Sequence, residues 1–198
     1  MQNIHKIEFI IGRPVVSLET ANKLGRIADL LVDPLSGQLA GLSVRRADGT
    51  YALASILDVH DIGPDAVIVE RDEALVLVAA SPLNKLPRAR RDLVGVKVIT
   101  DRGQILGAIS NLYLCIEKRP VFIYEIRSSF IDMLLGRRGY FAGSHACAFS
   151  TDRRSLVVNN AEQLDRQVIR AARRVAGPYN VGFHPAAAFD VQVRTHPH

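Results

Sequence analysis

The chain has 198 residues, of which 48% are hydrophobic and 23% are charged, so the composition is that of a globular protein and excludes a disordered one. The formal net charge of +5 mildly favours acidic partners, and two cysteines are too few for a disulfide framework or a four-cysteine zinc site and fit a reducing cytosol. The N-terminus lacks a secretion signal and the longest apolar run, residues 74–80, is far shorter than the ~20 residues of a spanning helix, so we expect a soluble, cytoplasmic protein without an integral membrane segment.

The beginning of the chain predicts a series of short strands. We expect a strand over residues 10–16 that starts at or lies along an edge of its sheet, because Pro14 cannot donate a ladder hydrogen bond. Two further strands, residues 25–32 and 38–45, flank a turn at residues 33–37. The sequence therefore opens with strand–turn–strand units.

The strand at residues 38–45 has a clear period of two. The apolar side chains on one face are Ala40, Leu42 and Val44, and the residues on the other face are Gly41, Ser43 and Arg45. This alternation predicts a half-buried strand. Asp48–Gly49 predicts a hairpin turn, because glycine takes positive φ without steric cost. A strand at residues 50–56 follows this turn, and a later turn at residues 63–65 leads to a strand at residues 66–69.

Residues 81–92 interrupt this pattern. They contain two prolines and the basic cluster of Arg88, Arg90 and Arg91, without apolar periodicity, which predicts a linker between domains.

The second half of the sequence repeats the first. Gly95 matches Gly12 at an offset of 83 residues, and Gly107 matches Gly25 at an offset of 82. At the offset of 82, the residues that fall on the apolar face of strand 38–45 are Phe122, Tyr124 and Ile126, and those that fall on its other face are Glu125 and Arg127. This repetition predicts a duplicated domain.

The rest of the chain predicts an insertion and a tail. The insertion, residues 129–136, has the Ser-x-x-Asp start and glycine stop of a short helix, and strands at residues 140–149 and 155–158 follow it. An amphipathic helix from residue 160 ends at Gly177–Pro178. The predicted division is thus residues 1–80, a linker at 81–92, residues 93–159, and a helical tail at 160–198.

Several short motifs, in this order, resemble the PRC-barrel domain: residues 12–15, 24–29, 33–37, 56–59 and 62–69. In the second copy, the segments similar to the second barrel of bacterial tandem PRC-barrel proteins are residues 95–98, 105–107 and 129–137. The resemblance implies a mainly all-β fold of two tandem small antiparallel β-barrels, with the C-terminal helix packed against them.

The PRC-barrel is shared by the cytoplasmic domain of the photosynthetic reaction-centre H subunit and by the C-terminal half of a ribosome maturation factor. The sequence departs from the first in lacking an N-terminal membrane helix, and from the second in lacking a separate N-terminal domain. The resemblance favours a non-enzymatic interaction or adaptor protein that binds another protein and acts as a homodimer or within a complex. An RNA- or ribosome-associated factor is the alternative, and a soluble relative of the H subunit with a role in photosynthetic electron transport ranks below it.

Candidate chemistry is sparse. His60–Asp61 with Ser55 or Ser81 has the residue types of a nucleophile and base, and His145 and Cys147 share a strand face as two metal ligands do. A metal site needs three or four ligands, and nothing in the sequence brings the serines to His60. We therefore expect no catalytic, cofactor or metal site.

The basic groups are the strongest candidates for contact with a partner or with nucleic acid, because the arginine fork binds two oxygens of a carboxylate or phosphate. They are Arg88, Arg90 and Arg91 in the linker, Arg137 and Arg138 after the inserted helix, and Arg166, Arg170, Arg173 and Arg174 in the tail. No aromatic-rich stacking motif accompanies them, and a solvated charged face is the competing explanation.

Overall fold

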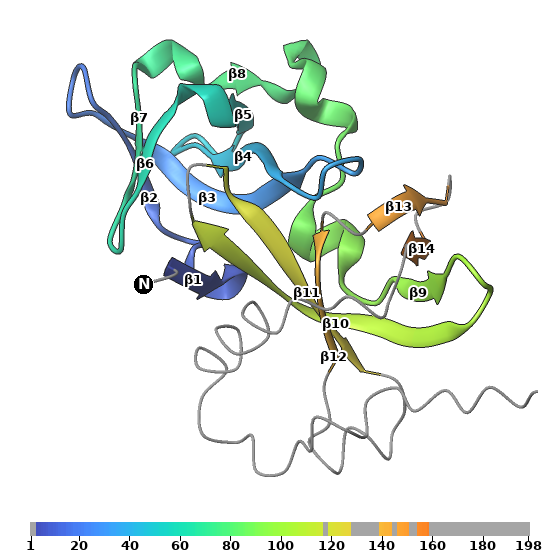
Figure 1. The fold of residues 1–198 in the computed structure, drawn as a ribbon. Coiled ribbons are helices and arrows are strands. Elements are labelled where there is room, and N and C mark those ends of the chain that lie inside the picture. The colour runs from blue at the N-terminus through green and yellow to red at the C-terminus, as the bar shows by residue number, and fades with distance from the viewer. Residues whose placement is uncertain (1–2, 117–118, 128–138, 144–145, 151–153, 159–198) are drawn as a thin grey trace, which may run out of the picture.

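The computed structural model describes residues 3–116, 119–127, 139–143, 146–150 and 154–158, and these form two seven-stranded sheets (Figure 1). The predicted mainly-β fold class is confirmed. The inserted helix and the tail helix lie outside the described residues, as do the tail arginines. Among the helical turns that the structure describes, none is long and apolar enough to cross a membrane.

The first sheet has the strand order β6-β7-β2-β3-β4-β5-β8. Its strands are β2 (Pro14–Ser17), β3 (Lys23–Val32), β4 (Leu39–Arg45), β5 (Tyr51–Ser55), β6 (Val59–Ile62), β7 (Val67–Val69) and β8 (Val76–Leu77). β2 is shorter than the strand predicted at residues 10–16 and begins only at Pro14, because residues 7–11 form a helical turn. The predicted edge position is wrong, since β2 lies between β7 and β3 with Pro14 as its first residue. β2 pairs in parallel with β7 and antiparallel with β3, and the other described pairs of this sheet are antiparallel.

The second sheet follows the order β12-β11-β10-β9-β14-β13, with β1 paired to β10. Its strands are β1 (Asn3–Lys6), β9 (Lys97–Thr100), β10 (Ile105–Ile116), β11 (Val121–Arg127), β12 (Gly139–Ala142), β13 (Ala146–Phe149) and β14 (Ser155–Val158). Here β9 and β14 form the parallel pair. The predicted strand at residues 140–149 is interrupted between β12 and β13, whereas β14 has the predicted bounds.

The segment predicted as a linker, residues 81–92, contains helical turns: η5 (Pro82–Lys85) and most of the π-helix η6 (Ala89–Leu93). The turn η4 (Val78–Ala80) precedes it, and the other turns are η1 (Ile7–Phe9), η2 (Ile56–Asp58) and η3 (Asp72–Ala74). η5 begins because Ser81 accepts a hydrogen bond from the backbone of Leu83 and Pro82 fits the first turn. η6 buries Ala89 and Leu93 completely, so this segment packs on the body of the protein.

The same backbone arrangement occurs at matching places in the two sheets. Gly12 and Gly95 have φ of +91° and +90°, and each donates a 2.8 Å backbone hydrogen bond across to a β-strand. The acceptors are the carbonyls of Ile27 and Ile109, which are themselves 82 residues apart. Positive φ at both positions explains why each is glycine. The pattern that suggested duplication thus recurs in backbone geometry, while the predicted domain boundaries stay a prediction.

The first segment of each half pairs with a strand of the other half. β1 pairs with β10, with Lys6 opposite Tyr113 (Figure 1). The corresponding segment before the second half pairs with β3, with Arg88 opposite Leu31. These two pairings are related by the same 82-residue offset, taken in opposite directions. We call the two segments the leaders, residues 3–11 and 86–94.

The tips of the β3–β4 and β10–β11 hairpins also meet. The backbone of Leu39 donates to the carbonyl of Pro120 at 2.8 Å, and that of Phe122 donates to the carbonyl of Gly37 at 3.0 Å. Gly37 lies so close to Gly143 that a Cβ at position 37 would overlap the Gly143 backbone. We call this contact the hairpin junction. It joins the sheets at a second place, independent of the leaders.

The core is continuous across both sheets, and it includes apolar residues from each half. The second face of β4 is also covered, contrary to the half-buried strand predicted there: Ser43 is 2% exposed, and the side chain of Leu83 from η5 packs beside Gly41. Glu125, predicted to lie on an outer face, is 0% exposed. Helical turns that follow the first sheet account for the coverage of β4, because they fold back over it.

Candidate functional site: an arginine-lined cleft

An open cleft of about 820 Å³ lies over the outer face of the first sheet. Its floor and walls are formed by Ala28, Asp29, Ser43, Tyr51, Leu77, Val78, Ala79, Arg88, Arg90 and Arg91. The structure therefore brings together in one cleft the three arginines that the sequence placed in a linker. Because η6 belongs to the second leader, this cleft is built by both halves of the chain.

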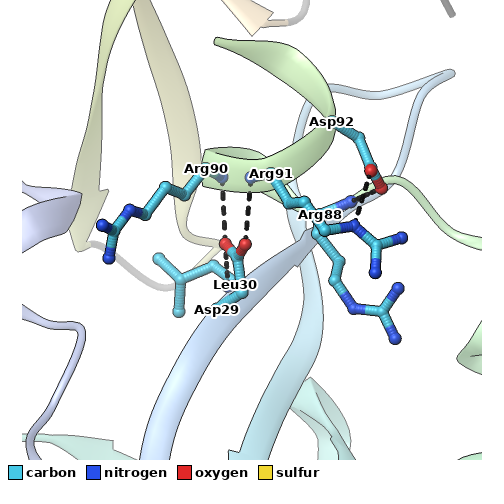
Figure 2. Close-up of polar contacts among 6 residues, drawn as sticks. All are labelled: Asp29, Leu30, Arg88, Arg90, Arg91 and Asp92. Carbon is cyan, nitrogen blue, oxygen red and sulfur yellow. Dashed lines mark hydrogen bonds and ion pairs between the residues drawn. The ribbon is translucent and has the colours of Figure 1, made fainter.

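Asp29 on β3 holds η6 in place (Figure 2). Its carboxylate oxygens accept the backbone N–H groups of Arg90 at 2.9 Å and Arg91 at 3.1 Å, and also that of Leu30 at 2.8 Å. Asp29 is 6% exposed, so its carboxylate is stabilised by hydrogen bonds from backbone N–H groups in place of water. The N–H groups at the start of η6 are thus occupied, and the arginine side chains are the groups that remain for a ligand.

The three arginines leave η6 in different directions. In Figure 2, the side chain of Arg90 extends away from those of Arg88 and Arg91. Arg91 forms a 2.9 Å ion pair with Asp92, whose other oxygen accepts the backbone N–H of Arg88 at 2.8 Å. Among the residues that the structure describes, no carboxylate forms an ion pair with Arg88 or Arg90. Two arginines that line the cleft, Arg88 and Arg90, are therefore without an ion pair to a described carboxylate.

The lining residues from β5, β8 and η4 are largely apolar, and in the sheet order β5 and β8 lie on the other side of β4 from β3, to which η6 is bonded. We call them the apolar wall, and the arginines of residues 88–91 the cationic wall. Tyr51 begins β5 and is 49% exposed, and Leu77 on the edge strand β8 is 52% exposed. β8 pairs with β5 through Ala52 opposite Leu77, and Val78 and Ala79 continue the wall into η4. The cleft lining thus combines exposed hydrophobic side chains with arginines.

The remaining predicted arginines cannot be placed. They are Arg137, Arg138, Arg166, Arg170, Arg173 and Arg174, and all of them lie outside the described residues. The same holds for His145 and for the side chain of Cys147. In the part of the chain that the structure describes, no group of three or more histidine, cysteine, aspartate or glutamate side chains has the arrangement of a metal site.

The residues considered for catalysis lie in structural positions. His60 Nδ1 lies 3.1 Å from Glu70 Oε1, in an exposed pair on the surface. The hydroxyl of Ser55 accepts the backbone N–H of Leu57 at the start of η2, and the hydroxyl of Ser81 caps η5 in the same way. Both serines therefore stabilise helical turns.

A second polar cluster was not predicted. The fully buried Glu125 accepts hydrogen bonds from the hydroxyls of Tyr113 at 2.8 Å and Ser110 at 2.9 Å, and Arg127 lies 3.8 Å away. A glutamate within the apolar run of β11 was the available signal in the sequence. The identity of the donors depends on the register of β10 against β11, which the local pattern does not give. Glu125 and Ser43 of the cleft are again 82 residues apart, so the second half has a filled polar cluster where the first half has a cleft.

Comparisons with known proteins place part of the chain in a family. One relative, from Bacillus subtilis (strain 168) and named "Uncharacterized protein YrrD", is 25% identical over 141 residues, which are 70% of this chain and 76% of the relative. The crystal structure of a Pseudomonas aeruginosa protein described as a 16S ribosomal RNA processing protein, RimM, is 18% identical and the match covers 80% of this chain and 98% of that one. The TM-score of this match is 0.28. The family model of the PRC-barrel domain matches residues 3–76, and this segment of the chain is therefore a PRC-barrel domain.

Proposed function

We propose that this is a non-enzymatic, cytoplasmic interaction protein, built from two PRC-barrel halves, that binds another protein at the arginine-lined cleft. The observation that carries the proposal is the composition of the cleft, whose lining includes exposed Tyr51 and Leu77 from β5 and β8, and Arg88 and Arg90 from the segment over β3. Interfaces between proteins are enriched in tyrosine and arginine at their centres, where each can bury a large side chain and still form polar contacts.

The shape of the site supports binding in preference to turnover. The acidic group of the cleft is engaged within the protein, because the Asp29 carboxylate accepts three backbone N–H groups. Ser43, the hydroxyl-bearing residue beside it in the lining, is 2% exposed. Catalysis by a nucleophile requires a base within hydrogen-bond reach, and the described histidine with a carboxylate partner, His60, is not among the residues of the cleft. The cleft offers a surface for recognition.

Site-specific photo-crosslinking in the full chain tests the proposal. A photoreactive residue at Ala79, in the cleft, is expected to capture a defined protein in cells of the native host. The same residue at Arg102, an exposed position on the β9–β10 turn, is the control. Capture at Ala79 must be lost when Arg90→Glu is added. Equal capture at both positions, or capture that survives the charge reversal, would refute the cleft as the binding site.

RNA is the second candidate, because Arg88 and Arg90 form no ion pair with a described carboxylate and the chain carries a net charge of +5. Binding through phosphates releases counterions, so log K for a single-stranded RNA should fall with log salt at roughly 0.7 per phosphate contact. Filter binding of an oligouridine over a salt series measures this slope. A salt-independent signal, or no binding at low salt, would exclude RNA.

The division into residues 1–80, 81–92, 93–159 and 160–198, and the homodimer, are part of the same proposal. The duplicated glycine geometry supports the tandem organisation. Light scattering of the full chain checks the dimer, and a monomer at high concentration would refute it.

A further inference from the structure

We propose that the cleft binds an extended segment of a partner protein in which apolar and acidic residues alternate. Its carboxylates would contact Arg88 and Arg90, and its apolar side chains would pack against Tyr51 and Leu77. This inference rests on the proposed function, and it adds the chemistry that a partner needs.

The charge of the ligand follows from the state of each ionic group in the cleft. The carboxylate of Asp29 accepts hydrogen bonds from the backbone N–H groups of Arg90 and Arg91, and the Arg91 side chain forms an ion pair with Asp92. Arg88 and Arg90 remain as cations without a described carboxylate within ion-pair distance. A guanidinium binds a carboxylate through two parallel hydrogen bonds, so the cleft is complementary to a ligand that brings two acidic groups.

The apolar wall decides between a peptide and a nucleic acid. Leu77, Val78 and Ala79 are aliphatic, and Tyr51 is the one aromatic side chain among the lining residues that the structure describes. Single-stranded nucleic acids bind on several aromatic rings, on which successive bases stack. Side chains alternate between two sides of an extended peptide, so one segment can present apolar groups to Leu77 and carboxylates to the arginines. The peptide fits both walls, whereas RNA fits one.

The cationic wall is formed before a ligand arrives. Asp29 fixes the backbone of Arg90 and Arg91, and the buried Ala89 and Leu93 anchor η6 in the core. Binding therefore orders arginine side chains and leaves the backbone unchanged, which lowers the entropic cost of association.

Fluorescence anisotropy with the full chain tests the inference. The probe is a short labelled peptide of alternating leucine and glutamate, and the two comparison peptides replace all glutamates by glutamine or all leucines by serine. We expect saturable binding of the first peptide and a Kd raised about tenfold or more for each comparison peptide. In the protein, Arg90→Glu and Leu77→Ser should weaken binding of the first peptide to a similar degree, and Arg102→Glu should leave it unchanged.

The outcomes separate the two proposals. Equal binding of the glutamate and glutamine peptides overturns the inference, as does binding that Arg90→Glu does not weaken. Binding of oligouridine that requires Arg90, without binding of the peptide, also overturns it and favours RNA. If crosslinking at Ala79 captures a protein in an Arg90-dependent way but the peptide does not bind, the proposed function holds and the acidic, alternating ligand is wrong. If neither occurs, both proposals fail.

Discussion

Substitution of Gly37 by alanine tests whether the hairpin junction holds the two sheets together. Gly37 has φ of +65°, a conformation that costs an L-residue about 1–2 kcal/mol. A Cβ there would also overlap the backbone of Gly143, and a Cβ on Gly143 would lie only 2.7 Å from the carbonyl oxygen of Gly37. Neither backbone can rotate out of the way as a side chain would, so the sheets must separate locally.

Gly49→Ala is the matched control. Gly49 has φ of +83° in the β4–β5 turn, and no heavy atom lies within 4 Å of a Cβ built there, so this variant carries the backbone strain without the overlap. We expect Gly49→Ala to lower the free energy of unfolding by about 1–2 kcal/mol. Overlap in a packed contact adds about 1–3 kcal/mol, so we expect Gly37→Ala to cost about 2–5 kcal/mol.

Urea unfolding of both variants measures these values, and hydrogen exchange locates the effect. The amides of Leu39 and Phe122, which donate across the hairpin junction, should lose protection in Gly37→Ala and keep it in Gly49→Ala. For a chain of this length, an extra 1–3 kcal/mol lowers the melting temperature by roughly 2–12 °C. Equal destabilisation by the two variants, with both amides still protected, would refute the junction.

Three further perturbations probe single contacts. The hydroxyl of Tyr124 is buried without a hydrogen-bond partner among the described residues, and burial raises its pKa; Tyr124→Phe should therefore leave stability unchanged or increase it by about 1 kcal/mol in urea unfolding, and a clear loss would show that the hydroxyl is bonded. The hydrogen bond from the Ser36 hydroxyl is the main cause that lowers the pKa of Asp33, so its contribution to stability is present above the ordinary carboxyl pKa and is lost as the pH falls through the lowered value. NMR titration should show Asp33 titrating below an ordinary aspartate, and Ser36→Ala should reduce the difference, with the backbone hydrogen bond from Leu35 retained. A Cβ on Gly25 would lie 2.5 Å from the carbonyl oxygen of Arg45, so Gly25→Ala should destabilise β3 against β4 by about 1–3 kcal/mol, and a neutral result would contradict the close approach.

Local rules were enough to predict much of the fold. The sequence match between Gly12 and Gly95 corresponds to the same positive-φ turn in both halves, a conformation that favours glycine. β14 and the β3–β4 hairpin follow from short-range alternation and turn residues. These features depend on neighbours in the sequence, which the pattern records.

The leaders and the cleft could not be predicted in this way. The sequence of β1 does not state which sheet it joins, because pairing with β10 is a contact across more than a hundred residues. In the second leader, the spacing of Ala89 and Leu93 was a helical signal that the neighbouring prolines and arginines obscured. Asp29 accepts the backbone N–H groups of η6 only because η6 packs over β3, and this contact joins residues about sixty positions apart in the sequence.

The exchange of leaders has a consequence for how such a molecule can be assembled. One half alone would have a long strand, β3 or β10, without its leader beside it, and a leader without a strand to pair with. Two copies of that half could satisfy both by exchanging leaders. In one polypeptide the pairing of each leader with the other half is intramolecular, so it occurs at a fixed effective concentration and does not depend on the concentration of the protein. If a protease cut the segment that connects the halves, the two fragments would stay associated through the exchanged leaders, and their dissociation would require these pairings to unfold.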